Sequence, residues 1–275
     1  MKNTHTVDYS KEHKIYLRNE KNKKLLVYFA QIVILILLFA LWEILTKHNI
    51  LDVFFFSSPT RVLKTITSLY KNGELFYHMK ITLEETLIAF ILATGMGFII
   101  AFVLWLSEYT RKISEPYLVV LNSLPKVALG PIIIIWMGAG KNAIITMAIL
   151  IVIIVTIMSV LNSFLSCDKD MILLCKSLGA NKLQTFFKVV LPNSLPDIVT
   201  IFKINIGLSW IGAIMGEYLV SRAGLGYLLI YGSQVFNLDL VITSTFLLCT
   251  LASIMYFAVS LFEKFVNSQR TQSRT

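Results

Sequence analysis

Apolar residues along this chain gather in six long blocks separated by polar segments. The first block runs for eighteen residues without a charged side chain. At about 1.5 Å per helical residue it is about 27 Å long, close to the hydrocarbon thickness of a bilayer. The pattern predicts six membrane-spanning helices, of which the third is interrupted by prolines: Leu25–Trp42, Leu87–Leu106, Pro116–Met137, Ala143–Leu165, Ile198–Glu217 and Leu240–Phe262.

The composition agrees with a membrane protein. Of 275 residues, 56% are hydrophobic and 15% are charged, and the mean hydropathy is +0.72. Soluble domains carry about 25% charged residues, and a soluble fold of this size could not bury so much apolar surface. The expected fold class is therefore an all-α integral membrane protein. The three cysteines and four histidines are scattered, which favours neither a disulfide framework nor a metal site.

The basic residues indicate how the chain is oriented in the membrane. Sixteen of the 25 Lys and Arg residues fall on one side of the six predicted spans, seven on the other and two within spans. Cytoplasmic loops carry such an excess, so the net charge of +9 reports orientation and not nucleic-acid binding. The expected organisation is a basic cytoplasmic tail over residues 1–24, a membrane domain over 25–266 and a cytoplasmic tail over 267–275. No cleavage pattern follows the first block, which predicts a retained span.

A short amphipathic helix is predicted on the outer side, between the first two spans. Ser58 can cap its start, and Pro59 occupies the first helical position. This helix would either rest on lipid headgroups or contact an extracytoplasmic partner. Its apolar residues recur at helical spacing: Val62, Leu63, Ile66, Leu69 and Tyr70.

The loop between the fourth and fifth spans, residues 166–196, is long and patterned. Asp168 and Asp170 lie where a first helix would begin, and Gly179 would end it. Asn181 and Gln184 have the spacing of a capping box for a second helix. Two short helices, apolar on one side and basic on the other, suit docking into a groove on another protein.

Each of these two helices has a predicted apolar face. Met171, Leu174, Cys175 and Leu178 share one side of the first helix. Pro192 and Pro196 are expected to close the unit. On the second helix the apolar side is formed by Leu183, Phe186, Phe187 and Val190.

The same loop resembles the EAA loop of permease subunits in binding-protein-dependent ABC importers. The resemblance rests on Gly179, Val189 and the pair Leu191-Pro192 at family spacing, together with the segment Lys176-Ser177-Leu178-Gly179-Ala180. Other stretches look like the nitrate, sulfonate and taurine branch of these permeases. They are Ser58-Pro59-Thr60, Leu124 to Pro131 with Trp136-Met137-Gly138, and Gly224-Leu225-Gly226-Tyr227.

The resemblance implies a six-helix transmembrane bundle of the type I ABC importer kind, in the cell membrane with both termini cytoplasmic. Such a subunit forms a dimer, receives solute from an extracytoplasmic binding protein and is driven by a separate ATPase, which holds ATP and magnesium. The chain itself would be no enzyme and bind no cofactor. By the same resemblance, a coupling role falls on Asp168, Asp170, Lys176, Ser177, Leu178, Gly179, Ala180, Leu191 and Pro192.

One departure concerns the acidic residue of the motif. Where the family has Glu-Ala-Ala, this chain has Leu173-Leu174-Cys175. Asp170 lies one helical turn earlier, and we expect it to substitute for the missing carboxylate.

Four residues within predicted spans are candidates for the translocation pathway: Lys126, Lys203, Trp210 and Glu217. A lysine at membrane depth costs about 2.5–3.5 kcal/mol and needs a reason. Lys126 lies on proline-broken backbone, which is tolerated where protein or a water-filled cavity surrounds it. Lys203 could instead reach the headgroups with its aliphatic stem. For Trp210 and Glu217 the rival interpretation is helix packing, because Gly207, Gly212 and Gly216 make this helix small-sided.

Two other function classes fit the sequence less well. An ion-coupled secondary transporter would need acidic residues or histidines near the midplane, and the predicted spans carry none at their centres. A membrane enzyme would need a catalytic constellation, and none is evident; Gly138-Ala139-Gly140-Lys141 lacks phosphate-loop spacing. Small anions such as sulfonates, taurine or nitrate fit the two intramembrane lysines, although the branch also includes importers of vitamin precursors.

Overall fold

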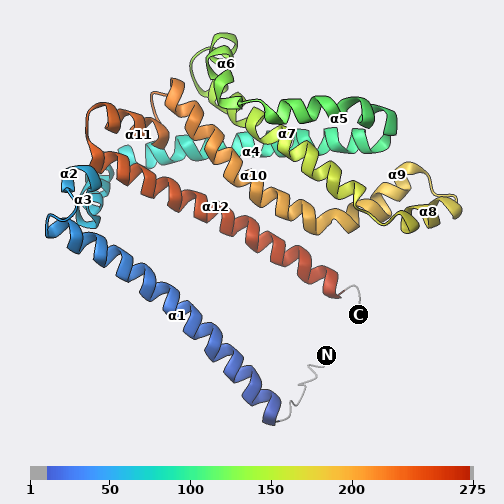
Figure 1. Ribbon diagram of the computed structural model, residues 1–275, viewed down its shortest axis with the longest axis horizontal. Coiled ribbons are helices and arrows are strands. Elements are labelled where there is room, and N and C mark those ends of the chain that lie inside the picture. Colours follow the sequence, from blue (N-terminus) through green and yellow to red (C-terminus); the bar gives the residue numbers. More distant parts are fainter. Residues whose placement is uncertain (1–10, 273–275) are drawn as a thin grey trace. The chain divides into compact units, whose positions relative to one another are not determined.

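A computed structural model describes the backbone of residues 11–272; the side chains of residues 11–15, 17 and 262–272, and all of residues 1–10 and 273–275, lie outside this description. The first part of the basic tail and the end of the C-terminal tail therefore fall outside the described residues. Within the described residues the backbone consists of helices joined by short turns and loops (Figure 1). The chain divides into two units, Met1–Lys64 and Thr65–Thr275. The helices are α1 (Lys11–Lys47), α2 (Val53–Phe56), α3 (Pro59–Lys71), α4 (Glu74–Leu106), α5 (Glu108–Ser123), η1 (Lys126–Leu129), α6 (Gly130–Met137), α7 (Lys141–Leu165), α8 (Lys169–Ser177), α9 (Lys182–Thr185), the π-helical η2 (Phe186–Val190), α10 (Leu191–Val220), α11 (Leu225–Gln234) and α12 (Leu238–Gln272).

The first unit consists of α1, α2 and the start of α3. The predicted cap is present, since the Arg61 N–H donates to Ser58 Oγ at 3.3 Å. Glu43 of α1 adds a second anchor: its carboxylate accepts from the Thr60 N–H at 3.0 Å and from the Thr60 hydroxyl at 2.7 Å. A carboxylate at a helix N-terminus satisfies donors that have no partner within the helix. Ser58-Pro59-Thr60 thus forms a start for α3 that is tied to the end of the first span.

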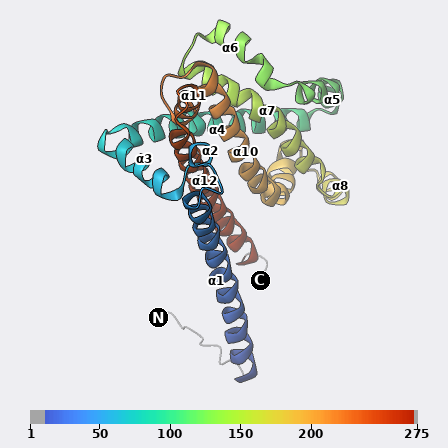
Figure 2. The same cartoon turned by 60° about the vertical axis from the view of Figure 1, so that its left-hand side comes forward.

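The second unit is built around α4, α7 and α10, which pack side by side (Figures 1 and 2). Small residues allow the close approach of α10 to α7: a Cβ on Gly212 would lie 2.5 Å from Ala148 Cα, and one on Gly216 would lie 2.8 Å from Ile144 Cα. Gly207 has open space beside it. The predicted small-sided packing face is therefore confirmed for two of the three glycines, while Gly207 lies on another side.

A buried amide joins the three central helices. Asn205 of α10 donates through Nδ2 to Thr94 Oγ1 of α4 at 3.0 Å and to Thr156 Oγ1 of α7 at 2.9 Å. Asn205 and Thr156 are completely buried, and Thr94 is nearly so. Interhelical hydrogen bonds of this kind hold apolar helices in one register within a membrane.

The third predicted span, Pro116–Met137, is wrong as a single helix. Five helices of the described chain are long and apolar enough to cross a bilayer, and a sixth crossing requires counting a pair of segments, residues 108–123 and 126–137, that meet at 85°. The break follows from Pro125, which has no N–H and forces Leu124 into an extended conformation (φ −65°, ψ 137°). Pro116 lies inside α5.

The prediction that Pro192 and Pro196 close the loop is also wrong. Residues 182–220 form one continuous helical segment, and both prolines lie in its α10 part. The five-residue π-helical turn η2 comes directly before Leu191. A π turn changes the hydrogen-bond register of a helix, so the missing Pro192 donor is accommodated there without a break.

Candidate functional site

The loop between α7 and α10 begins and ends its short helices with the predicted caps. The Asp168 carboxylate accepts from the Asp170 N–H at 2.8 Å at the start of α8. Gly179 has a φ of +79°, a left-handed conformation that ends helices and favours glycine. At α9, Gln184 N–H donates to Asn181 Oδ1 at 2.8 Å, and Asn181 N–H donates to Gln184 Oε1 at 2.9 Å. The predicted capping box is confirmed.

One aromatic side chain anchors this loop to the ends of the long helices. Phe186 is 1% exposed, and its ring centroid lies 4.5 Å from that of Phe102, 5.1 Å from that of Trp105 and 5.0 Å from that of Phe164. Phe102 and Trp105 belong to α4, and Phe164 belongs to α7. A movement of the loop is therefore passed directly to two of the three central helices, because close-packed side chains transmit displacement.

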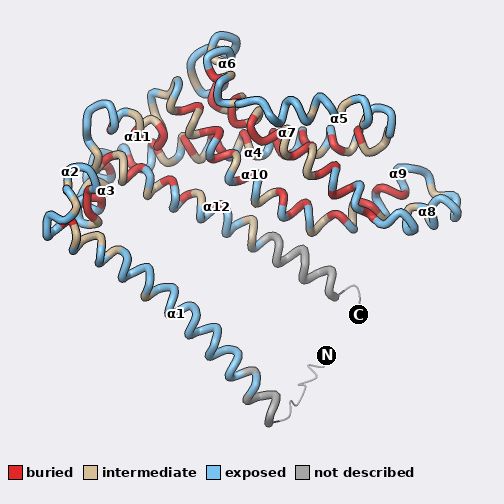
Figure 3. The backbone as a smooth tube through the Cα atoms, viewed as in Figure 1, coloured by how far each residue is buried: buried red, intermediate tan, exposed pale blue. Residues whose placement is uncertain are grey.

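The opposite side of the loop is exposed, as the pale blue course of α8 shows in Figure 3, and it carries large apolar side chains. Of the predicted face on α8, Met171, Leu174 and Leu178 are exposed, and Leu178 reaches 78%. The predicted apolar side of the second helix is wrong in part: Phe186 and Val190 are buried, whereas Leu183 and Phe187 are exposed. The bend at Gly179 and the π turn direct these residues to different sides.

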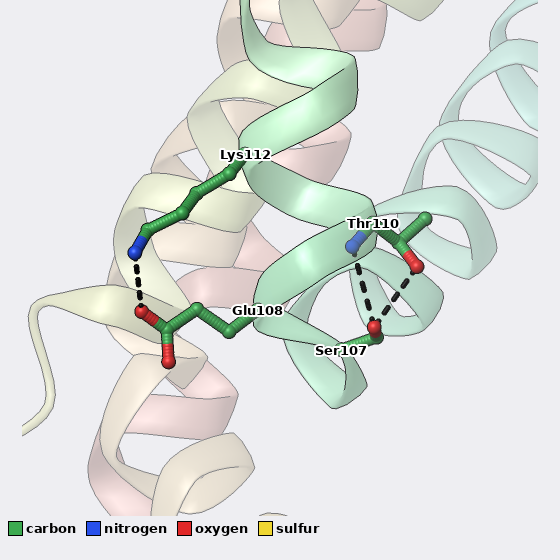
Figure 4. A network of polar contacts seen from close by, with 4 residues as sticks. All are labelled: Ser107, Glu108, Thr110 and Lys112. Atoms are coloured by element: carbon green, nitrogen blue, oxygen red, sulfur yellow. Dashed lines mark hydrogen bonds and ion pairs between the residues drawn. The ribbon is translucent and has the colours of Figure 1, made fainter.

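A polar turn beside the loop connects α4 to α5 (Figure 4). Ser107 caps α5, and its Oγ accepts from the Thr110 N–H at 3.3 Å and the Thr110 hydroxyl at 2.9 Å. Glu108 forms an ion pair with Lys112 at 2.9 Å. Lys182 of α9 donates to the carbonyl oxygen of Leu106, the last residue of α4, at 3.0 Å. The loop is thus also tied to this turn through a main-chain carbonyl.

The second polar cluster surrounds the first turn of α11. The Gly226 and Tyr227 N–H groups donate to Glu217 Oε2 of α10 at 2.6 and 3.2 Å. Gly224 N–H donates to His78 Nδ1 at 2.9 Å, and Leu225 N–H donates to Thr82 Oγ1 at 2.7 Å, both on α4. Four N–H groups at the start of a helix have no partner within it, and here buried side chains supply all four acceptors.

This cluster explains the segment Gly224-Leu225-Gly226-Tyr227. A Cβ on Gly224 would lie 2.4 Å from Glu217 Oε2, and one on Gly226 would lie 2.8 Å from the same atom. Gly224 also has a φ of +112°. Both glycines are needed because any larger side chain would displace the Glu217 carboxylate.

The four predicted pathway residues do not come together. Lys126 is half-buried at the break after α5, and its Nζ donates to the Asn122 carbonyl oxygen at 3.1 Å. Lys203, half-buried, places its Nζ 5.6 Å from the Tyr256 ring centroid of α12. Trp210 is 4% exposed within a cluster of α11 and α12 side chains, and Glu217 is fully buried against α11. Within one chain, the three α10 residues therefore contact neighbouring helices, and their pathway role stays a prediction.

Several buried polar residues were not singled out from the sequence. His78, Thr82 and Glu85 of α4 are 7%, 0% and 3% exposed, and Glu85 lies beside Glu217. Their spacing of four and three residues places them on one helical face, a polar stripe in an apolar helix. That stripe was the available signal. Its target, the start of α11, lies about 146 residues away along the chain and could not be inferred.

Comparison with protein families places this architecture among transport components. Residues 93–268 match the model of a family described as binding-protein-dependent transport system inner membrane component. The taurine transport system permease protein TauC of Escherichia coli is 24% identical over 226 residues, covering 80% of this chain and 82% of TauC. The formylaminopyrimidine transport permease protein ThiX of Halalkalibacterium halodurans is 26% identical over 192 residues, covering 70% and 76% of the two chains.

The fold is also found among solved structures. A chain of the methionine ABC transporter MetNI, in an inward-facing conformation, matches with a TM-score of 0.62 and 20% identity, covering 69% of this chain and 94% of that one. The predicted fold class is confirmed by this likeness. The relatives are named transport permeases, which supports the prediction of a transport subunit and not an enzyme.

Proposed function

We propose, for a chain that belongs to the family of binding-protein-dependent transport system inner membrane components, the role of permease subunit in an ATP-driven importer. The multi-pass membrane character and the permease family are established above. The observation that carries the ATP-driven part is the loop of α8 and α9, with an exposed apolar surface on one side and Phe186 packed against α4 and α7 on the other.

The ATPase would bind the exposed side of α8. Its contacts are expected on Leu174 and Leu178, with Asp170 supplying the carboxylate that the Leu173-Leu174-Cys175 segment lacks. Asp168, Lys176, Ser177, Gly179 and Ala180 hold or flank this surface. Leu191 and Pro192 lie at the start of α10, where a displacement of the loop would be transmitted to the central helices. ATP and magnesium would remain on the partner subunit.

Because the loop is rigidly anchored, it can transmit movement of the ATPase to the central helices. Phe186 and Val190 are buried, and Lys182 is bonded to Leu106, so the loop cannot tilt without α4, α7 and α10. Packed helices tend to switch between discrete arrangements and to pass small displacements over long distances. Alternating access would follow from such a switch, with both termini and this loop in the cytoplasm as the distribution of basic residues predicts.

The remaining partners are an extracytoplasmic binding protein, a second permease copy and membrane lipid. A homodimer would enclose a pathway that one chain does not form, and Lys126, half-exposed at the break between α5 and α6, is the charged residue best placed to line it. A small anion such as taurine, another sulfonate or nitrate would be attracted to two copies of Lys126. The likeness to TauC supports that class, while the likeness to ThiX supports a formylaminopyrimidine, one candidate vitamin precursor, as the alternative.

The test is association of this permease with the ATPase subunit of the importer. Leu178→Asp, at a side chain 78% exposed directly after α8, should weaken binding of that ATPase at least about tenfold, because an apolar anchor becomes charged. Tyr109→Asp, 84% exposed on the neighbouring α4–α5 turn, is the matched control and should bind normally. ATP-dependent uptake into proteoliposomes should follow the same order. Uptake by the permease alone, driven by an ion gradient, would instead establish a secondary transporter.

A further inference from the structure

A cavity of about 230 Å³ lies between the α4–α5 turn and the loop of α8 and α9. Its walls come from four helices, and two of its lining residues, Lys176 and Ala180, also flank the proposed ATPase contact. At about 30 Å³ per water molecule, it has room for roughly seven waters or a small polar group. The residues around it fall into an apolar floor and a basic rim.

The floor is formed by Trp105, Ile172 and Ala180, all half-buried. Trp105 packs against Phe186, with ring centroids 5.1 Å apart, so its position is held by the same aromatic cluster that anchors the loop. Leu106, the final residue of the membrane-spanning helix α4, also lines the cavity. Because Leu106 ends the second predicted span, the cavity is expected near the boundary between the hydrocarbon core and the headgroup region that holds the lipid phosphates.

The rim carries three basic side chains from three elements: Arg111 of α5, Lys176 of α8 and Lys182 of α9. The single carboxylate that lines the cavity, Glu108, is already paired with Lys112 at 2.9 Å (Figure 4). Lys182 uses one donor on the Leu106 carbonyl oxygen and keeps the others. The rim thus holds an excess of positive charge.

We propose that this cavity binds the phosphate group of a phosphate ester and so joins the α4–α5 turn to the α8–α9 loop. Arg111 supplies a guanidinium that can pair with two phosphate oxygens, and Lys176 and Lys182 supply point charges from the other side. The apolar floor receives the glycerol carbons next to the phosphate. Both an anionic lipid headgroup and a soluble phosphate ester share this chemistry, and the place of Leu106 at the end of a span favours the lipid.

This inference rests on the proposed function in one respect: the cytoplasmic orientation of the loop means that the lipid would come from the cytoplasmic leaflet. Binding is therefore measured without transport, on the permease purified together with its ATPase. The lipid probes are phosphatidylglycerol and phosphatidylcholine, compared by native mass spectrometry. The soluble probe is glycerol 3-phosphate, titrated by calorimetry in detergent.

The decisive variant is Arg111→Gln with Lys176→Gln, which should lower the affinity for phosphatidylglycerol about 30-fold, from about fivefold per basic residue near a membrane surface. Lys169→Gln with Lys188→Gln removes the same charge from the same loop outside the cavity and should cost less than about fivefold. Glu108→Gln removes the one carboxylate and should raise the affinity, a change that misfolding would not imitate. Phosphatidylcholine should bind weakly to all four proteins.

The two probes distinguish a lipid from a soluble phosphate ester as the source of the phosphate group. Binding of glycerol 3-phosphate with the same order of variants, and no preference for phosphatidylglycerol, would support the site with a soluble ligand. Equal losses in the two double variants would overturn the proposal, because the attraction would then be a general property of the basic surface. Failure of both probes to bind the assembled complex would overturn it as well. Neither failure would affect the Leu178→Asp result.

Discussion

Glu217 and Gly226 are joined by a hydrogen bond of 2.6 Å from the Gly226 N–H to the Glu217 Oε2 atom. The bond connects α10 to the first turn of α11, and a Cβ on Gly226 would lie 2.8 Å from the accepting oxygen. The glycine and the carboxylate are therefore one structural unit: the close approach that makes the bond possible requires that residue 226 has no side chain. The same unit explains why two glycines occur in Gly224-Leu225-Gly226-Tyr227.

Gly226→Ala should destabilise the permease by about 1–3 kcal/mol, because the added methyl must displace the Glu217 carboxylate in a fully packed site. The thermal unfolding midpoint in detergent measures this. Gly207→Ala on α10 is the matched control: open space surrounds that position, and alanine is the better helix former. An equal loss of stability in the two variants would contradict the role of Gly226.

Thr82→Val should accelerate hydrogen exchange at the start of α11. The Leu225 N–H loses its acceptor, Thr82 Oγ1, while the shape of the side chain is kept, and a buried unpaired N–H costs about 1–3 kcal/mol. Thr86→Val is the control, since the Thr86 hydroxyl donates to the Thr82 carbonyl oxygen of its own helix. Exchange at residues 224–227 that is identical in the two variants would show that α11 is held by other contacts.

Asn205→Ala should weaken the association of α4, α7 and α10 by about 1–2 kcal/mol, the range measured for interhelical polar contacts in membranes. A double-mutant cycle with Thr94→Val checks the cause. If the bond from Asn205 Nδ2 to Thr94 Oγ1 is responsible, the two losses should not add. Strictly additive losses would mean that the bond to Thr94 does not contribute, leaving the bond to Thr156 Oγ1 and packing as the causes.

The cysteines on either side of the start of α8 should differ in reactivity. Cys167 is 2% exposed, and its burial, followed by the nearby Asp168 carboxylate, raises the pKa of its thiol. The reactive thiolate is then scarce at neutral pH and becomes available only as the pH rises towards that higher pKa. Cys175, half-exposed on α8, should be alkylated rapidly by a charged maleimide.

The same labelling experiment tests the orientation of the loop. In inverted membrane vesicles Cys175 should react from the cytoplasmic side, and the bound ATPase should protect it. Labelling of Cys175 in intact cells by an impermeant reagent would place the loop on the outer side and contradict the proposed coupling. A variant with Cys175→Ser serves as the blank.

The long spans were predictable because hydrophobic length is a local property. Eighteen uncharged residues from Leu25 to Trp42 can only be accommodated by lipid, and α1 indeed continues through them. The caps at Asp168, Asn181 and Ser58 were predictable for the same reason, since each cap joins residues two or three positions apart. The break at Pro125 was visible as an irregularity, but not as an angle of 85° between two segments.

Apolar pattern, charge asymmetry and short-range capping thus determined from sequence alone that this is a multi-pass membrane protein with a patterned loop, and the permease prediction came from the resemblance of that loop to a known family. Tertiary structure decided which side of each helix is buried: Phe186 packs while its neighbour Phe187 is exposed, and Gly212 contacts α7 while a Cβ on Gly207 would meet no atom of the described residues within 4 Å. It also brought His78, Thr82 and Glu217 to the start of α11. The physical reason is that hydropathy and capping depend on neighbours along the chain, whereas burial depends on surfaces that meet only when distant helices pack.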